Sequence, residues 1–100
     1  MNHYIKISTE SLKSDSHKIN ELVTSAEKQL QVIYNEIEIL DGMWDGPANE
    51  VFVKQFAQDY ELFKNMCSFV RAFSNDMNNA AIEYERCENN VKDAIKAIRV

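Results

Sequence analysis

Apolar residues recur at alternating spacings of three and four residues along the first half of the chain. Nine positions form this first seam, and only Ser16 among them is polar: Leu12, Ser16, Ile19, Val23, Ala26, Leu30, Ile33, Ile37 and Leu40. A 3.5-residue period of this length predicts a helix that packs along its whole length. Ser8 or Thr9 is a suitable N-cap. We therefore predict a helix over about residues 9–41.

The second half of the chain repeats this alternation of three- and four-residue spacings without interruption. Fourteen positions form this second seam, and only Asp59 breaks their apolar character: Phe52, Phe56, Asp59, Phe63, Met66, Val70, Phe73, Met77, Ala80, Tyr84, Cys87, Val91, Ala94 and Ile98. Pro47 suits the first turn of a helix, where its missing N–H has no cost. The pattern predicts a second helix over about residues 47–98.

Both glycines and the only proline fall between the two seams, within residues 41–47. We expect Gly42 to end the first helix in the left-handed conformation and Gly46 to reverse the chain. A connection this short makes the two helices antiparallel neighbours. The fold class is therefore all-α, a single helical-hairpin domain over residues 1–100.

The second helix carries an additional uncharged stripe beside its seam, interrupted only by Glu88. Its members are Val53, Tyr60, Cys67, Ser74, Ala81 and Ile95. Two stripes on one helix predict two partners, because an isolated pair of helices buries little surface. We assign the seam to the first helix and the additional stripe to a second chain, which completes a four-helix bundle. The predicted dimer interface contains Val53, Tyr60, Cys67 and Ala81, and a Cys67–Cys67 link between chains would then be within reach.

Composition and charge narrow the range of functions that the chain could have. The chain has 11 basic and 16 acidic side chains and a net charge of −5. It has no basic face, which argues against nucleic acid and against an anionic membrane as partners. No stretch approaches the roughly 20 apolar residues of a membrane span, and residues 1–7 lack the apolar run of a signal peptide. A homodimer is expected, with a heterodimer as the alternative because two copies would double the negative charge.

The sequence offers few candidate residues for catalysis or metal binding. His3 and His17 share no metal-ligand spacing with each other or with the cysteines, so we predict no metal site and no cofactor. No nucleophile–base set or phosphate-binding loop is visible, which indicates a protein without catalytic activity. Trp44, in the turn, fits either a plug over the end of the core or an exposed recognition anchor. Tyr84 fits either a core aromatic or, together with Glu88 one turn later, a recognition surface.

These features together resemble the WXG100 family, the ESAT-6-like proteins exported by type VII secretion systems of Gram-positive bacteria and mycobacteria. The resemblance covers the whole chain. It depends on the mid-chain Trp44-Asp45-Gly46 turn between two heptad seams and on Tyr84-Glu85-Arg86-Cys87-Glu88 near the end.

The resemblance implies a four-helix dimer that is exported without a cleaved signal peptide and recognised by an FtsK/SpoIIIE-like ATPase. Tyr84 and Glu88 match the family's export motif, and Trp44 and Gly46 match its turn motif, which is thought to complete the signal across the dimer. The expected function is that of a secreted, non-enzymatic substrate. Two alternatives remain: a dedicated partner or chaperone of a larger toxin, and an intracellular interaction adaptor.

The lengths of the two helices also predict what lies at the open end of the hairpin. Counted from the turn, Leu12 should face residues 73–77, and Tyr84 should lie beyond the start of the first helix. The turn of a partner hairpin would then lie beside Tyr84. We expect residues after about Asn79 to be less protected than residues 52–77.

Overall fold

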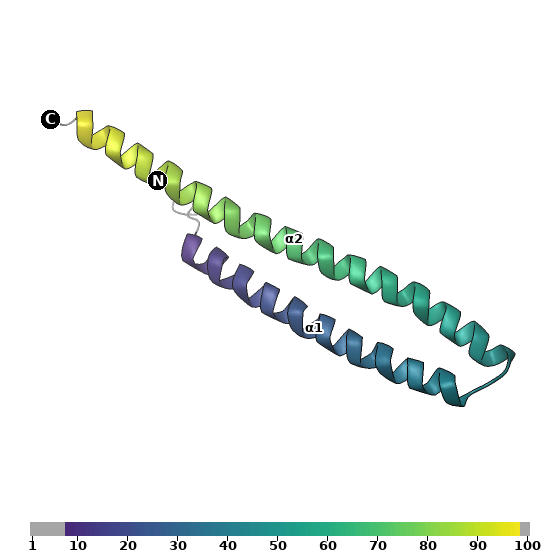
Figure 1. The fold of residues 1–100 in the computed structure, drawn as a ribbon. Helices are drawn as coiled ribbons and strands as arrows, with labels where there is room; N and C mark the ends of the chain where they lie inside the picture. Colours follow the sequence, from purple (N-terminus) through teal and green to yellow (C-terminus); the bar gives the residue numbers. More distant parts are fainter. Residues whose placement is uncertain (1–7, 99–100) are drawn as a thin grey trace.

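The computed structural model describes residues 8–98, which form two antiparallel helices, α1 (Thr9–Met43) and α2 (Pro47–Ile98). Figure 1 shows them as a hairpin with one turn, and the molecule measures 82 × 20 × 17 Å. The predicted all-α hairpin is confirmed, with helix bounds within two residues of those expected. His3 lies outside the described residues, and His17 is exposed on α1.

Local capping explains where each helix begins. The Ser8 hydroxyl accepts a hydrogen bond from the Ser11 backbone N–H (3.3 Å), so Ser8 is the N-cap of α1. The Gly46 carbonyl accepts the first helical bond of α2, from the Glu50 N–H (3.2 Å), and Pro47 follows in the first turn. Gly46 has a φ of 120°, a conformation that a side chain would strain.

The prediction that Gly42 ends α1 in the left-handed conformation is wrong. Among the described residues, positive φ occurs at Gly46 alone, and α1 continues through Gly42 to Met43. Trp44 then leaves the helix in an extended conformation (φ −126°, ψ 113°). Because Trp44 redirects the chain directly into an extended segment, a left-handed residue is not needed at the end of α1.

Small side chains form the contact between the two helices. Ser16 and Val23 of α1 and Cys67, Ser74 and Ala81 of α2 are buried, and Ala81 and Ser74 have no exposed surface at all. Ser16 and Ser74 meet across the interface, where each hydroxyl donates to the backbone carbonyl of the other residue (2.7 and 2.8 Å). The additional stripe of α2 therefore faces α1.

This arrangement corrects the assignment of the two stripes. Cys67 and Ala81, expected at a dimer interface, are already covered by α1 of the same chain. Val53 and Tyr60 belong to the same stripe and are half-buried. With its thiol between the helices of one hairpin, Cys67 is also poorly placed for a disulfide with a second chain. The stripe of small residues allows the helix axes to approach closely, which the bulky phenylalanines of the seam would prevent.

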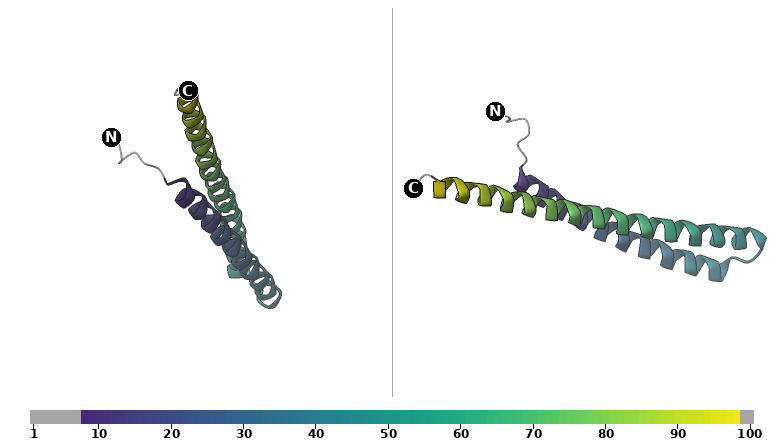
Figure 2. Two further views of the ribbon diagram at one scale, coloured as in Figure 1. Left: turned by 90° about the vertical axis from the view of Figure 1, so that its left-hand side faces the viewer. Right: turned by 90° about the horizontal axis from the view of Figure 1, so that it is seen from above.

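The second helix extends well past the start of the first, as Figures 1 and 2 show. Thr9 and Lys13 of α1 both bind Glu85 of α2, so α1 covers α2 as far as Glu85. The expectation that Tyr84 lies beyond the start of α1 was therefore off by nearly two turns, and Tyr84 lies beside that start. Residues 86–98 are helical and exposed throughout.

Neither α1 nor α2 has a segment apolar enough, over a sufficient length, to cross a lipid bilayer.

Candidate functional site

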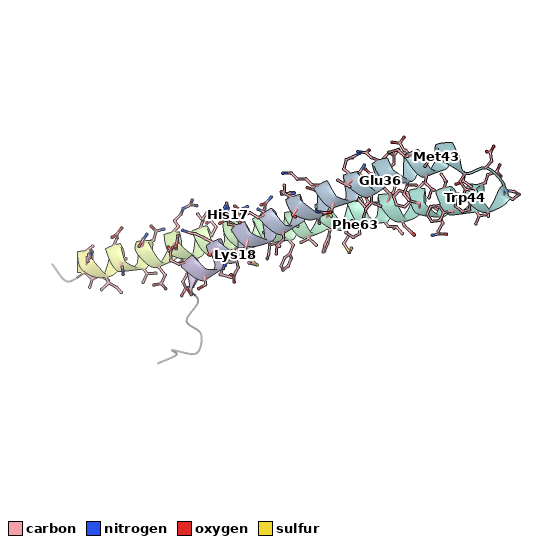
Figure 3. The ribbon with its side chains drawn as sticks, turned by 90° about the horizontal axis from the view of Figure 1, so that it is seen from below. His17, Lys18, Glu36, Met43, Trp44 and Phe63 are labelled. Carbon is pink, nitrogen blue, oxygen red and sulfur yellow. The ribbon has the colours of Figure 1, made fainter. Side chains whose placement is uncertain are left out.

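The turn of the hairpin presents a partly exposed aromatic pair. The Trp44 ring lies against Phe52, with ring centroids 5.9 Å apart and an interplanar angle of 49°. Trp44 nevertheless keeps 37% of its surface exposed. Figure 3 shows it at the turn end of the molecule, next to Met43 and far from His17 and Lys18. One side of the Trp44 ring therefore packs on Phe52, as a plug over the end of the core would, and the remainder is accessible.

The open end of the hairpin carries the second candidate element. Tyr84 and Glu88 lie one turn apart on α2 and, with Thr9 of α1, line a shallow hollow that also includes Glu85 and Asn89. The negative charge of Glu88 is the main cause of a raised pKa for the Tyr84 phenol. The raised pKa favours the neutral, hydrogen-bond-donating form of the Tyr84 phenol. The sequence-predicted pair thus forms one accessible polar surface.

An ionic clamp holds α1 against this surface. The Thr9 hydroxyl donates to Oε2 of Glu85 (2.6 Å), and Lys13 Nζ lies 2.6 Å from Oε1. The hydrogen bond from Lys13 is the main cause of a lowered pKa at Glu85, and the bond from Thr9 adds to it. Each of the two carboxylate oxygens therefore has a partner on α1.

Sequence reasoning missed Glu85, although it lies within the predicted motif. The signal that could have revealed it is positional: Glu85 directly follows Tyr84, and Thr9 and Lys13 are one turn apart at the predicted start of the first helix. The sequence prediction set the helix register by counting residues from the turn, and that register placed Glu85 too far from Thr9 and Lys13 for a bond between them.

The two candidate elements lie at opposite ends of one chain. From Pro47 to Tyr84 the helix rises about 55 Å at 1.5 Å per residue, and Trp44 lies beyond its first residue. One hairpin therefore cannot combine Trp44 and Tyr84 in a single recognition surface. A second hairpin packed antiparallel to the first would bring its turn to the open end of this one.

A long apolar groove runs between the helices on one face of the hairpin. It consists of two adjoining hollows that share Ala26 and Phe63. Its lining comes from both helices: Ile19, Leu22, Val23, Ala26, Gln29, Leu30, Ile33, Phe56, Asp59, Tyr60, Phe63, Met66, Cys67 and Val70. Beside it, Leu62 is 67% exposed, Phe69 72% and Phe73 59%. So much exposed apolar surface on one side of a small chain is typical of an interaction face.

Polar side-chain bonds between the helices lie on the face opposite the groove, on the other side of the row of buried residues between α1 and α2. Arg71 donates to Glu27 (2.6 Å) and to Thr24 (3.1 Å), and Asn20 donates to Asn75 (3.0 Å). Together with the Glu85 clamp, these bonds close one face of the hairpin with hydrophilic side chains. The hairpin is therefore two-sided, with a hydrated face and an apolar face that has no cover within the described chain.

The comparison with protein families decides the classification. The model for WXG100, "Proteins of 100 residues with WXG", matches residues 4–89. The chain belongs to the WXG100 family. Family membership identifies Trp44-Asp45-Gly46 as the W-x-G turn and implies secretion through a type VII system.

Two solved structures share this fold. EsxA of Geobacillus thermodenitrificans is 18% identical, with a TM-score of 0.77 over 89% of this chain and 99% of that one. The secreted protein EsxB of Bacillus anthracis is 22% identical, with a TM-score of 0.73 over 83% of this chain and 92% of that one. The comparison with curated protein sequences gave no match. The elongated hairpin is thus the fold of these ESAT-6-like proteins.

Proposed function

We propose that this WXG100 protein is a non-enzymatic type VII secretion substrate that is exported as a folded bundle of two hairpins. The observation that carries the proposal is the open end of the hairpin, where Tyr84 and Glu88 form an accessible surface beside the start of α1. A tyrosine donor beside a carboxylate, held on a rigid helix, offers a directional contact to a receptor. An FtsK/SpoIIIE-like ATPase is the proposed receptor.

The turn supplies the second half of the proposed signal. In an antiparallel pair of hairpins, the partner's Trp44 and Gly46 would lie near Tyr84, which one chain cannot achieve across about 55 Å. The exposed part of Trp44 then becomes available to the same receptor. Export of the assembled pair, rather than of single chains, would follow from a signal divided between two hairpins.

The apolar groove is the proposed contact between the two hairpins. It takes over this role from the stripe of Val53, Tyr60, Cys67 and Ala81, because α1 buries Cys67 and Ala81. Tyr60 and Cys67 also line the groove at its edge. The strict heptad seam of α2 lines the groove through Phe56, Phe63 and Val70. The regular spacing of this seam matches what packing against further helices requires.

Export through the proposed route is tested in a bacterial strain that encodes the secretion ATPase. The chain is expressed in this strain and in a matched strain without the ATPase, and the culture medium is assayed beside a cytoplasmic marker of lysis. We expect the chain in the medium of the first strain only. Equal amounts in both media, or retention in the cells of both strains, would contradict the proposal.

A second function, as dedicated partner of a larger toxin with a similar hairpin, is favoured by the charge within the groove. Asp59 is the one charged residue in the lining of the two hollows, so a second copy would bring another carboxylate and no cation to pair with it.

A further inference from the structure

The most C-terminal bond between the two helices, within the described part of the chain, lies inside the proposed export motif. Thr9 and Lys13 of α1 bind the two carboxylate oxygens of Glu85, each at 2.6 Å. Glu85 directly follows Tyr84 and precedes Glu88 by three residues. The start of α1 is therefore joined to the motif on α2 through the one side chain that lies between the two motif residues.

Glu85 ends the row of α2 residues that face α1. Ala81, one turn earlier, has no exposed surface, and side chains four residues apart lie on the same side of a helix. Tyr84 and Glu88 both lie to one side of Glu85, at about 100° and about 60° around the helix axis. Because a helix turns as a unit, holding Glu85 against α1 also sets the direction in which Tyr84 and Glu88 point.

The two motif residues are neighbours only while the backbone between them is helical. A spacing of four residues brings Tyr84 and Glu88 together on a helix surface and separates them in an extended chain. Residues 86–98 are exposed and have no cover from α1, and such helical segments open locally at low free energy. The clamp at Glu85 is therefore placed where it would stop this opening before it reaches Tyr84.

The clamp is too exposed to be a main support of the fold. The side chains of Lys13 and Glu85 keep 34% and 31% of their surface exposed, and ion pairs near the surface contribute little to stability. The helices are held together chiefly by the buried row that includes Cys67, Ser74 and Ala81. Loss of the clamp should therefore leave the hairpin folded and change the molecule only at its open end.

We propose that Thr9 and Lys13 are positioning residues of the export signal. By holding Glu85, they keep Tyr84 and Glu88 on an ordered turn of α2 that points in one direction. The inference rests on the proposed function, because it names what orients the signal that the receptor binds. A chain whose α1 has not docked would present the motif on a frayed helix. The clamp thus makes export conditional on a closed hairpin.

Two matched pairs of variants separate the bonds of the clamp from the bulk of its side chains. Lys13→Met removes the ammonium group and Thr9→Val removes the hydroxyl, each with little change in size. Lys13→Arg and Thr9→Ser are the conservative variants that keep the bonding group. Ser74→Ala, which weakens the helix contact nearly three turns before the motif, is the control for a loss of stability alone. Circular dichroism verifies the helix content of each variant.

Hydrogen exchange by NMR tests the positioning without any receptor. The measured quantity is the mean exchange rate of the Tyr84 and Glu85 amides divided by that of residues 67–77. We expect this ratio to rise at least about threefold in Lys13→Met and Thr9→Val. It should stay within about twofold of the parent's in the two conservative variants and in Ser74→Ala. An unchanged ratio in Lys13→Met and Thr9→Val would overturn the inference.

Export into the culture medium tests the consequence for the signal. We expect the amount of exported protein to fall at least about fivefold for Lys13→Met and for Thr9→Val. Lys13→Arg, Thr9→Ser and Ser74→Ala should be exported within about twofold of the parent. Loss of export without faster exchange at the motif would mean that the two side chains touch the receptor directly, and this would also overturn the inference.

Tyr84→Ala in the same export assay separates the inference from the proposed function. Normal export of Tyr84→Ala would contradict the proposed signal itself. Blocked export of Tyr84→Ala together with parental export of Lys13→Met and Thr9→Val would contradict the positioning role alone, and the export proposal would stand.

Discussion

Ser16 and Ser74 bind each other reciprocally in the middle of the hairpin contact. Each hydroxyl donates to the carbonyl of the opposite helix, and the two hydroxyl oxygens lie 3.1 Å apart. Both residues are buried, and Ser74 is fully enclosed. The pair explains why the seam of the first helix tolerates one polar residue. It also fixes the register, because sliding either helix by one turn would leave both hydroxyls without partners.

Replacing Ser74 by alanine should destabilise the hairpin. Ser74→Ala removes the bond to the Ser16 carbonyl, and we expect the free energy of unfolding to fall by about 1 kcal/mol. Ser68→Ala, on an exposed position of α2, is the matched control and should change it by less than about 0.5 kcal/mol. Urea unfolding followed by circular dichroism measures both at one protein concentration. Equal stability of the two variants would show that the serine pair does not hold the helices together.

The two glycines should respond to alanine with opposite signs. Gly46→Ala places a side chain at a φ of 120°, so we expect a loss of at least about 1 kcal/mol. Gly42→Ala places a methyl group inside α1 with no atom within 4 Å, and should stabilise by about 0.5–1 kcal/mol. Thermal unfolding of the two variants and the parent measures the difference. A stabilising Gly46→Ala would contradict the turn geometry.

The clamp at Glu85 should weaken in acid. Because Lys13 and Thr9 lower the Glu85 pKa below its ordinary value of 4.5, the clamp contributes stability above that pH, and the contribution is lost as the pH falls through the lowered pKa. Glu85→Gln should therefore be less stable than the parent at pH 7, and this difference should shrink below pH 4.5. Melting temperatures across this range measure it, with Glu61→Gln as the control. A parent–variant difference that is independent of pH would contradict the clamp.

Backbone protection should change where α1 stops covering α2. We expect amide hydrogens of residues 67–85 to exchange slowly and those of residues 86–98 to exchange faster, since the latter are exposed and have no cover from α1. This places the boundary near Glu85, nearly two turns later than the position near Asn79 that the sequence indicated. Hydrogen exchange of the purified chain by NMR locates it. Uniform rates from 67 to 98 would contradict this boundary.

The helices and their ends follow from local signals, which is why the sequence predicts them closely. These local signals are the heptad spacing, the N-cap Ser8, and Pro47 after Gly46. Each of them acts within one or two helical turns. The sequence also shows that α2 carries two stripes. It does not show which stripe faces α1, because both have the same period.

The assignment of the two stripes depends on side-chain size. The hairpin selects the stripe of Cys67, Ser74 and Ala81 because small side chains permit close approach and allow the two serines to bond. The phenylalanines of the strict seam are left for the groove. The register of α1 against α2 also depends on contacts between residues far apart in the sequence, such as Thr9 with Glu85. The spacing of apolar residues along the chain cannot reveal such contacts.

The most direct test of the proposed function is export of variants altered at the open end. Tyr84→Ala and Glu88→Ala remove the proposed signal, and Asp93→Ala, at an exposed position nearby on α2, is the control. We expect the amount of protein in the culture medium to fall at least about tenfold for the first two variants and to stay unchanged for the third. All three should keep parental helix content and sedimentation. Normal export of both Tyr84→Ala and Glu88→Ala would contradict the proposal that this surface is the export signal.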